Sequence, residues 1–193
     1  MLQFILQENA RYTLPEMAQM AIEGGCKWVV LDVPSLTDAE VRELAADLVP
    51  LCRETSTILT ITDRVELAKE LGLHGVVLTP ASPLSARAAR ELCGPEAIIG
   101  VQVSVASSAM ALTGIDVDYV VFPADVPVAT VGENVEALRI AKFVLPVVAT
   151  VDSMPDIALV KVLGINGLAM GVPLANASDP VAATEEVVSL LQK

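Results

Sequence analysis

A regular alternation of apolar stretches and helix-like segments constrains this chain more than any other feature. Each apolar stretch is short and rich in Val, Ile, Leu and Ala, and each precedes a segment with helix signals. This alternation is typical of βα units whose strands are parallel and buried. The sequence predicts eight such strands, over residues 3–7, 28–33, 59–62, 75–79, 97–103, 117–122, 145–150 and 167–170.

Eight βα units in a chain of 193 residues predict a single (β/α)8 barrel domain, the TIM-barrel fold, over residues 1–193. A chain of this length is most often one domain with a substantial core, and eight regular units leave little room for insertions. An open doubly wound sheet stays the alternative, because periodicity alone does not show that the sheet closes.

Helix boundaries are indicated by capping residues, proline and glycine. Thr37 and Glu40 have the spacing of a capping box, in which a hydroxyl and a carboxylate satisfy free amides at a helix start. Thr130 and Glu133 have the same spacing, so they are also expected to cap a helix. Helices are predicted over residues 14–23, 37–53, 63–71, 82–94, 107–112, 130–143, 155–163 and 179–191.

Composition agrees with buried strands and limits the partners. Hydrophobic residues make up 53% of the chain but aromatic residues only 3%, a mixture that suits parallel strands covered by helices. A formal net charge of −12 repels nucleic acids and anionic lipids, so we expect neither as a main partner. No apolar run reaches the roughly 20 residues that span a bilayer, and no basic region precedes an apolar core at the N-terminus. We therefore expect a soluble, unprocessed protein.

The three cysteines indicate a reducing compartment. Cys26, Cys52 and Cys93 are odd in number and far apart, and their spacing matches no metal site. They fit small buried hydrophobic residues of a protein whose thiols stay reduced. We therefore expect a cytoplasmic protein.

In a (β/α)8 barrel, functional groups follow the carboxyl ends of the strands, because the βα loops converge there. At these positions the sequence is acidic and hydroxylic, with Gln7, Asp32, Thr62, Asp63, Thr79, Gln102, Ser104, Asp125, Thr150, Asp152, Ser153 and Gly171. A Schiff-base aldolase needs a lysine at this end. That class is disfavoured, because the lysines stand elsewhere, as Lys27, Lys69, Lys142, Lys161 and Lys193.

The single histidine, His74, precedes a strand and is expected at the opposite end in a structural role.

Asp63 is the main candidate for a functional carboxylate. It directly follows a predicted strand, and carboxylates suit Mg²⁺, which commonly uses one or two of them together with substrate phosphate oxygens. The position is also where a helix N-cap is expected, and the two roles are not exclusive. Asp152 and Ser153 could equally cap the helix that follows them. Arg64 is the only basic side chain near this end apart from Arg11.

Five segments carry a resemblance to a known family: ITDRVELAKELGLHGVVL (61–78), GPEAIIGVQV (94–103), DVDYVVF (116–122), LPVVAT (145–150) and GINGLAM (164–170). In this order and with this spacing, they resemble the thiamine phosphate synthase and thiazole tautomerase family. The resemblance covers nearly the whole chain and is strongest from residue 57 onward. It implies a (β/α)8 barrel, usually dimeric, that joins a pyrimidine diphosphate to a thiazole phosphate with the help of Mg²⁺.

The resemblance also implies roles for individual residues. Asp63 stands where the family has a Mg²⁺ ligand, and Arg64 follows it as in the family, although Thr62 replaces an asparagine. The family therefore implies Mg²⁺ as a cofactor, a small phosphorylated ligand and a homodimer. The positions expected to contact the substrate are Asp32, Thr62, Arg64, Gln102, Thr150 and Asp152.

Several positions depart from the family pattern. Asp32 replaces an arginine that grips the diphosphate, Ser82 replaces a second metal carboxylate, and Val151-Asp152 replaces a Gly-Gly phosphate loop. Each missing charge-assisted hydrogen bond typically costs ~1.5 to 3 kcal/mol. The sequence therefore predicts reduced, altered or lost synthase activity. Two alternatives stay open: a non-catalytic barrel that binds a small ligand or a partner protein, and another Mg²⁺-assisted enzyme that uses Asp63 with Asp32 or Asp152.

Overall fold

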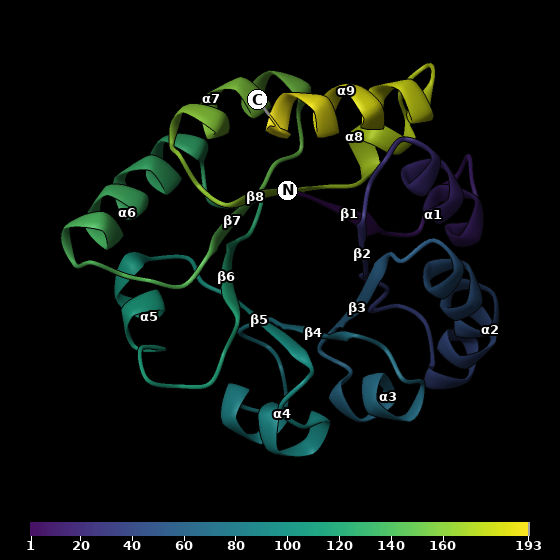
Figure 1. Cartoon of the computed structure of the whole chain (residues 1–193), viewed down its shortest axis with the longest axis horizontal. Helices are drawn as coiled ribbons and strands as arrows, with labels where there is room; N and C mark the ends of the chain where they lie inside the picture. Colours follow the sequence, from purple (N-terminus) through teal and green to yellow (C-terminus); the bar gives the residue numbers. More distant parts are fainter. Residues whose placement is uncertain (193) are drawn as a thin grey trace.

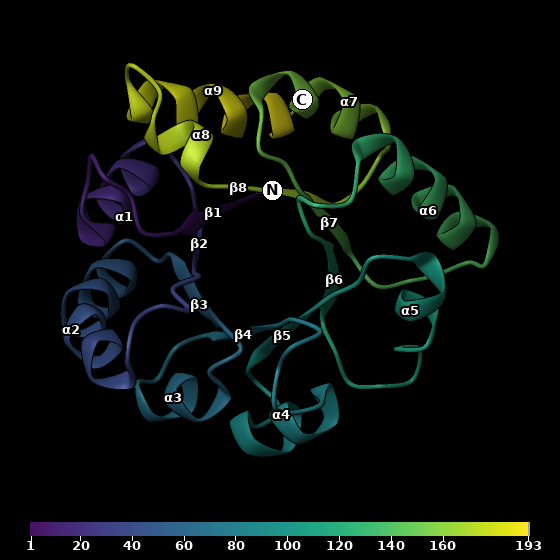
Figure 2. The ribbon, with the colours of Figure 1, turned by 180° about the vertical axis from the view of Figure 1, so that it is seen from behind.

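The computed structural model describes residues 1–192, without the side chains at positions 159 and 160; Lys193 lies outside the described residues. Eight parallel strands form a closed barrel in sequence order, and helices surround it on the outside (Figures 1 and 2). The predicted (β/α)8 fold is confirmed, and the open-sheet alternative is wrong, because β1 pairs with β8. The strands are β1 (Leu2–Leu6), β2 (Trp28–Leu31), β3 (Ile58–Thr62), β4 (Gly75–Leu78), β5 (Ile98–Gln102), β6 (Tyr119–Phe122), β7 (Val147–Thr150) and β8 (Gly167–Met170).

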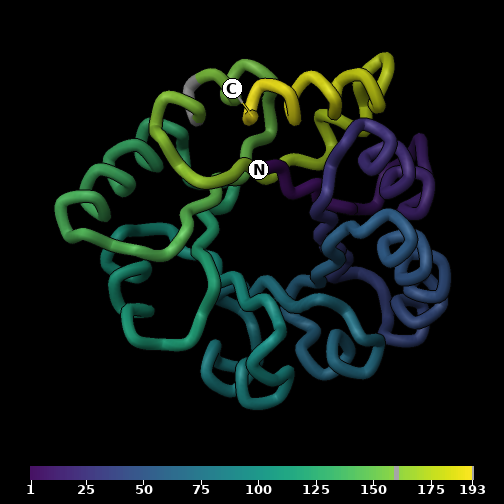
Figure 3. The backbone as a smooth tube through the Cα atoms, viewed as in Figure 1, coloured from purple at the N-terminus to yellow at the C-terminus, as the bar shows by residue number. Residues whose placement is uncertain are grey.

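The helices follow the predicted order with one addition, the short helix α8 after the last strand. The last helix, α9, packs beside α1, so the two ends of the chain meet on one side of the ring (Figure 3). Within residues 1–192, no helix is both long and apolar enough to cross a membrane. The helices are α1 (Leu14–Glu23), α2 (Asp38–Glu54), α3 (Val65–Glu70), α4 (Ala86–Cys93), α5 (Ala106–Met110), α6 (Val128–Ile140), α7 (Met154–Val162), α8 (Val172–Ala175) and α9 (Pro180–Gln192).

Capping residues explain why some of the helix N-termini were predicted correctly from the sequence. The capping box of Thr37 and Glu40 is present at the start of α2, and a second box opens α1. The predicted cap at Thr130 is wrong, because α6 already begins at Val128 after Pro127 and Thr130 lies within its first turn. Pro127 is the N-cap residue of α6, where its missing N–H costs no hydrogen bond within the helix, and this signal outweighs the capping spacing.

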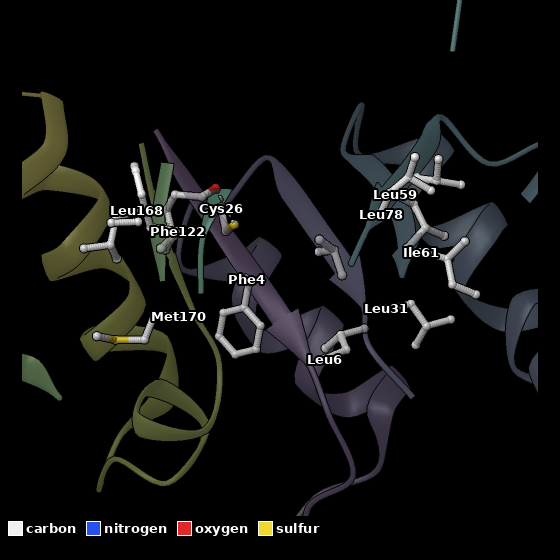
Figure 4. Close-up of a cluster of buried hydrophobic side chains, with 14 of the residues drawn as sticks. Phe4, Leu6, Cys26, Leu31, Leu59, Ile61, Leu78, Phe122, Leu168 and Met170 are labelled. Carbon is white, nitrogen blue, oxygen red and sulfur yellow. Dashed lines mark hydrogen bonds between the residues drawn. The ribbon is translucent and has the colours of Figure 1, made fainter. Parts of the chain in front are cut away.

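Two hydrophobic layers hold the barrel together. Side chains that point outward from the strands pack against the helices, and Figure 4 shows part of this layer around Phe4, Leu6 and Met170. Alternate side chains point into the barrel and form a separate, smaller cluster. Because both faces of every strand are buried, the strands read as continuous apolar runs. The buried members of the inner cluster are Trp28, Val30, Val77, Tyr119, Val121, Val148 and Ala169.

Glycine makes room for the two aromatic rings inside the barrel. Trp28 and Tyr119 meet edge to face with ring centroids 5.3 Å apart. A Cβ atom at Gly100 would lie 2.4 Å from the Tyr119 ring, so the tyrosine occupies the space above this glycine. A Cβ atom at Gly75 would lie 1.9 Å from the carbonyl oxygen of Ile98 on the neighbouring strand. Both glycines are therefore required by close packing.

The first prediction concerns Gly75. The substitution Gly75→Ala is expected to destabilise the protein by about 3 kcal/mol or more, because its methyl group must displace the backbone of β5. Gly132→Ala in α6 is the matched control: its Cβ meets only the flexible end of Leu163, at 3.1 Å, and alanine favours a helix. Urea unfolding of both variants measures the difference. Equal stability of the two would contradict the close strand approach.

Candidate functional site

A small cavity lies inside the barrel at the carboxyl ends of the strands. Its volume is about 30 Å³, enough for one or two waters. Both aliphatic and polar side chains line it. The lining residues come from all eight strands or the positions just after them: Gln3, Ile5, Val30, Asp32, Thr62, Val77, Gln102, Val121, Thr150 and Ala169.

Four of the predicted substrate-contact residues meet in this cavity. Asp32, Thr62, Gln102 and Thr150 all line it, and all four are half-buried. Asp32 accepts a hydrogen bond of 2.9 Å from the side-chain amide of Gln7. We find no hydrogen bond from the other three side chains to the described part of the protein, so their polar groups stay available.

Asp63 lies at the same end of the barrel but does not line the cavity. Its backbone is in the left-handed region, with a φ of 59°. Its carboxylate accepts two hydrogen bonds from Thr79 at the end of β4, one from the backbone N–H at 2.7 Å and one from the hydroxyl at 2.5 Å. The predicted N-cap role is wrong, because α3 begins after Arg64 and has no side-chain cap. Asp63 instead joins the ends of β3 and β4.

Arg64 turns away from the cavity toward the loop between β2 and α2. Its guanidinium pairs with Asp38 and donates to the backbone carbonyl oxygens of Leu36 and, at 3.3 Å, of Val33. The side chain is 20% exposed, so the cation is largely enclosed by these partners. Because its donors are used in this way, Arg64 stabilises the β2–α2 loop.

Asp152 lies apart from the cavity, in an exposed position between β7 and α7. Its neighbour Ser153 donates a hydrogen bond of 2.6 Å to the carboxylate of Asp156, in the first turn of α7. The structure thus brings four of the predicted residues together and places Asp63, Arg64 and Asp152 outside the cavity.

The carboxylates at this end do not fit an enclosed Mg²⁺ site. Among residues 1–192, no three His, Cys, Asp or Glu side chains gather closely enough to hold a metal ion. Asp32 and Asp63 each already accept hydrogen bonds from a neighbouring side chain. Mg²⁺ needs near-octahedral oxygen ligation and so would depend here on water or on a ligand for most of its contacts.

His74 has the structural role that was predicted for it. Its ring nitrogen Nδ1 accepts a hydrogen bond of 3.0 Å from the backbone N–H of Leu59. The backbone N–H of His74 in turn donates to the carbonyl oxygen of Leu59 at 2.9 Å. These paired bonds tie the starts of β3 and β4 together, at the end of the barrel opposite the cavity.

Gln3 and Tyr119 are polar residues inside the barrel that the sequence reasoning did not single out. Gln3 is 1% exposed and forms part of the cavity lining, and Tyr119 is 2% exposed. Burial raises the pKa of the Tyr119 phenol well above its usual value, while the adjacent Gln3 amide opposes the rise. The alternation of Gln3, Ile5 and Gln7 along β1 was the available signal, because residues two apart share one face of a strand.

Comparisons with known proteins agree with this architecture. A family model described as "Thiamine monophosphate synthase" matches residues 2–167. A thiamine-phosphate synthase of Bacteroides thetaiotaomicron is 32% identical, over 98% of this chain and 96% of the relative. One from Bacteroides fragilis is 30% identical, over 98% of each. The solved structure of a thiamine phosphate pyrophosphorylase from Pyrococcus furiosus has a TM-score of 0.85 and 26% identity, covering 99% of this chain and 95% of its own.

The second prediction tests the contact between Asp63 and Thr79. A double-mutant cycle with Asp63→Asn and Thr79→Val is expected to give a coupling of about 1.5 to 3 kcal/mol, because the Thr79 hydroxyl donates a charge-assisted hydrogen bond to the Asp63 carboxylate. Asparagine tolerates the left-handed backbone, so the cycle isolates the loss of charge. Chemical unfolding of the four proteins measures it. Additive effects would mean that the Thr79 hydroxyl does not bind the Asp63 carboxylate.

Proposed function

The chain belongs to the thiamine monophosphate synthase family, and from that premise we propose that its barrel has lost most of the synthase activity and binds a small ligand without phosphate. The observation that carries this proposal is the charge of the cavity. None of its ten described lining residues is basic, and Asp32 contributes a carboxylate. A diphosphate is bound by cations and preorganised amides, so this lining opposes it.

Arg64 strengthens the proposal. It is the basic residue next to Asp63, yet its guanidinium is bound to Asp38 and to two carbonyl oxygens of the β2–α2 loop. Turning it toward the cavity would leave those partners unpaired, at a cost of about 1 to 3 kcal/mol for each buried group. A diphosphate would have to overcome this cost as well as the repulsion by Asp32.

The third prediction concerns turnover. With a pyrimidine diphosphate, a thiazole phosphate and Mg²⁺, we expect kcat/KM at least a thousandfold below that of the Bacteroides thetaiotaomicron relative. The loss of three charge-assisted contacts at about 1.5 kcal/mol each accounts for such a factor. Product formation measured by chromatography decides the question. Turnover close to that of the relative, abolished by Asp63→Ala, would refute the proposal.

The binding of Mg²⁺ and pyrophosphate provides an independent test of the proposed loss of synthase activity. We expect neither Mg²⁺ nor pyrophosphate, alone or together, to raise the melting temperature, because a ligand stabilises only the state that binds it. A rise that Asp63→Asn removes would instead support the alternative of a Mg²⁺-assisted enzyme that uses Asp63. The relative serves as the positive control in this titration.

The location and assembly of the protein are also proposals. Cys26, Cys52 and Cys93 are free thiols, which supports a reducing cytoplasm. Exposed aliphatic side chains on neighbouring helices support a homodimer: Ile140 at the end of α6 and Val162 at the end of α7 are 76% and 80% exposed. Val144, in the loop that leads to β7, is 86% exposed. We propose that these three side chains form one apolar patch, which is typical of an interface.

The fourth prediction tests the dimer. Val144→Glu is expected to convert a dimer into a monomer, because a charge would be buried without a partner in the interface. Analytical ultracentrifugation at micromolar concentration measures the change. Ala129→Glu, in the first turn of α6, is the control and should leave the mass unchanged. A monomeric parent protein would rule out the proposed assembly.

A further inference from the structure

A second cavity lies at the amino-terminal ends of β3 and β4, opposite the end of the barrel that carries the candidate site. It is placed between the last turn of α2 and the loop that leads from α3 to β4, and its volume is about 170 Å³. A cavity of roughly 150 Å³ is enough to hold a benzene ring. The lining residues are Val49, Cys52, Arg53, Ser56, Leu59, Gly72, Leu73 and His74.

The lining of this cavity divides by exposure. The thiol of Cys52 and the side chain of Leu59 belong to residues that are only 1% and 2% exposed. Three polar residues, Arg53, Ser56 and His74, are exposed. The apolar side chains therefore form the inner part of the cavity, and the polar ones border its opening. A ligand that fits this lining has an apolar part inside and a polar group at the opening.

His74 presents a hydrogen-bond donor to this cavity. Its Nδ1 atom accepts a hydrogen bond of 3.0 Å from the backbone N–H of Leu59, so Nδ1 carries no proton. In a neutral imidazole the proton is then on Nε2. Within residues 1–192 we find no acceptor for that N–H group. The bond that ties β3 to β4 thus also fixes the ring as a donor.

Arg53 and Ser56 add donors at the same opening. In the described part of the chain, neither the guanidinium of Arg53 nor the hydroxyl of Ser56 has a hydrogen-bond or ion-pair partner. A guanidinium is always charged, and its planar set of N–H groups matches the two oxygens of a carboxylate. None of the eight described lining residues is acidic, although the chain has 24 acidic residues and 12 basic ones. The lining therefore selects an anion.

Negative partial charge at the end of α2 is already neutralised. A helix C-terminus attracts cations through its free carbonyl oxygens. Here the carbonyl oxygen of Cys52 accepts from the backbone N–H of Thr57 at 2.8 Å, and that of Thr55 accepts from the Lys27 ammonium at 3.0 Å. Burial raises the pKa of the Cys52 thiol to about 11, so the thiol also stays uncharged near neutral pH. Neither group opposes an anion in the cavity.

We propose that this cavity binds a small organic carboxylate with a compact apolar tail. The carboxylate is held by Arg53, Ser56 and His74 at the opening, and the tail lies against Leu59 and Leu73 inside. An inorganic anion would leave the apolar interior unfilled, and an uncharged ligand would leave the guanidinium without a counter-charge. The site is at the other end of the barrel from the cavity lined by Asp32, so the inference does not rest on the proposed function.

The fifth prediction uses the single histidine as a reporter. Because the chain has one histidine, the nuclear magnetic resonance signals of its ring need no assignment. In the free protein, the ring ¹⁵N signals are expected to show the proton on Nε2. At constant pH, benzoate is expected to shift these signals and to bind at least about tenfold more tightly than benzamide, which has no charge, or acetate, which has no ring.

Three variants locate the site. Arg53→Gln is expected to weaken benzoate at least about tenfold and to leave benzamide unchanged. Ser56→Gly should weaken benzoate severalfold without lowering the melting temperature, because Ser56 has a φ of 53° and glycine adopts this conformation readily. Arg87→Gln is the matched control: it removes an exposed positive charge from α4 and should leave the affinity for benzoate unchanged.

Several results would overturn the inference. These are unchanged His74 signals at millimolar benzoate, equal affinity for benzoate and benzamide, or an affinity that Arg53→Gln does not alter. Acetate or inorganic phosphate that binds as tightly as benzoate would show an anion site without a place for an apolar tail, which is also a different site from the one proposed. The synthase assay and the pyrophosphate titration report on the opposite end of the barrel, so they decide the proposed function independently of these results.

Discussion

Closure of the sheet is the constraint on which the rest of this structure depends. Once β1 pairs with β8, no strand edge is left to bind another chain, and every strand has one face toward the helices and one toward the barrel axis. The inner face must then be filled by side chains that fit a narrow space. The rings of Trp28 and Tyr119 fill the lower part, and Gly75 and Gly100 provide room where strands and rings approach most closely.

Several polar side chains are buried inside the barrel near the amino-terminal ends of the strands. Near the amino-terminal ends of the strands, Trp28 is satisfied, because its indole N–H donates to the Thr60 hydroxyl at 3.1 Å. The Gln3 amide and the Tyr119 hydroxyl also lie near these ends of their strands, and both side chains are buried. A fold with a net stability of only about 5 to 15 kcal/mol retains unpaired buried groups at a considerable cost.

The sequence predicted the fold well because the signals for it are local and repeated. Apolar runs, glycine stops and the capping box of Thr37 and Glu40 each act within a few residues. The site was predicted in part for the same reason, because alternate residues of a strand face opposite sides. Thr62 is the last residue of β3 and faces the barrel interior, whereas Asp63, one residue later, falls on the other side of the strand. The contacts of Arg64 reach Val33 and Leu36, about 30 residues earlier, and no local pattern indicates them. Helix α8 is one turn long and was missed because so short a segment has little periodicity.

The helix N-termini at the carboxyl ends of the strands also carry negative charge, as the cavity lining does. In a (β/α)8 barrel the helix N-termini face the carboxyl ends of the strands, and their free N–H groups attract anions. Here carboxylates already occupy several of these sites. Glu16 and Glu40 accept from backbone N–H groups at the starts of α1 and α2, and these bonds hold the pKa of each carboxyl below its usual value. Asp179 accepts from the backbone N–H of Ala182 in the same way at α9. The N-termini of α1, α2 and α9 therefore carry negative charges of their own, which oppose a phosphate at these three helix ends.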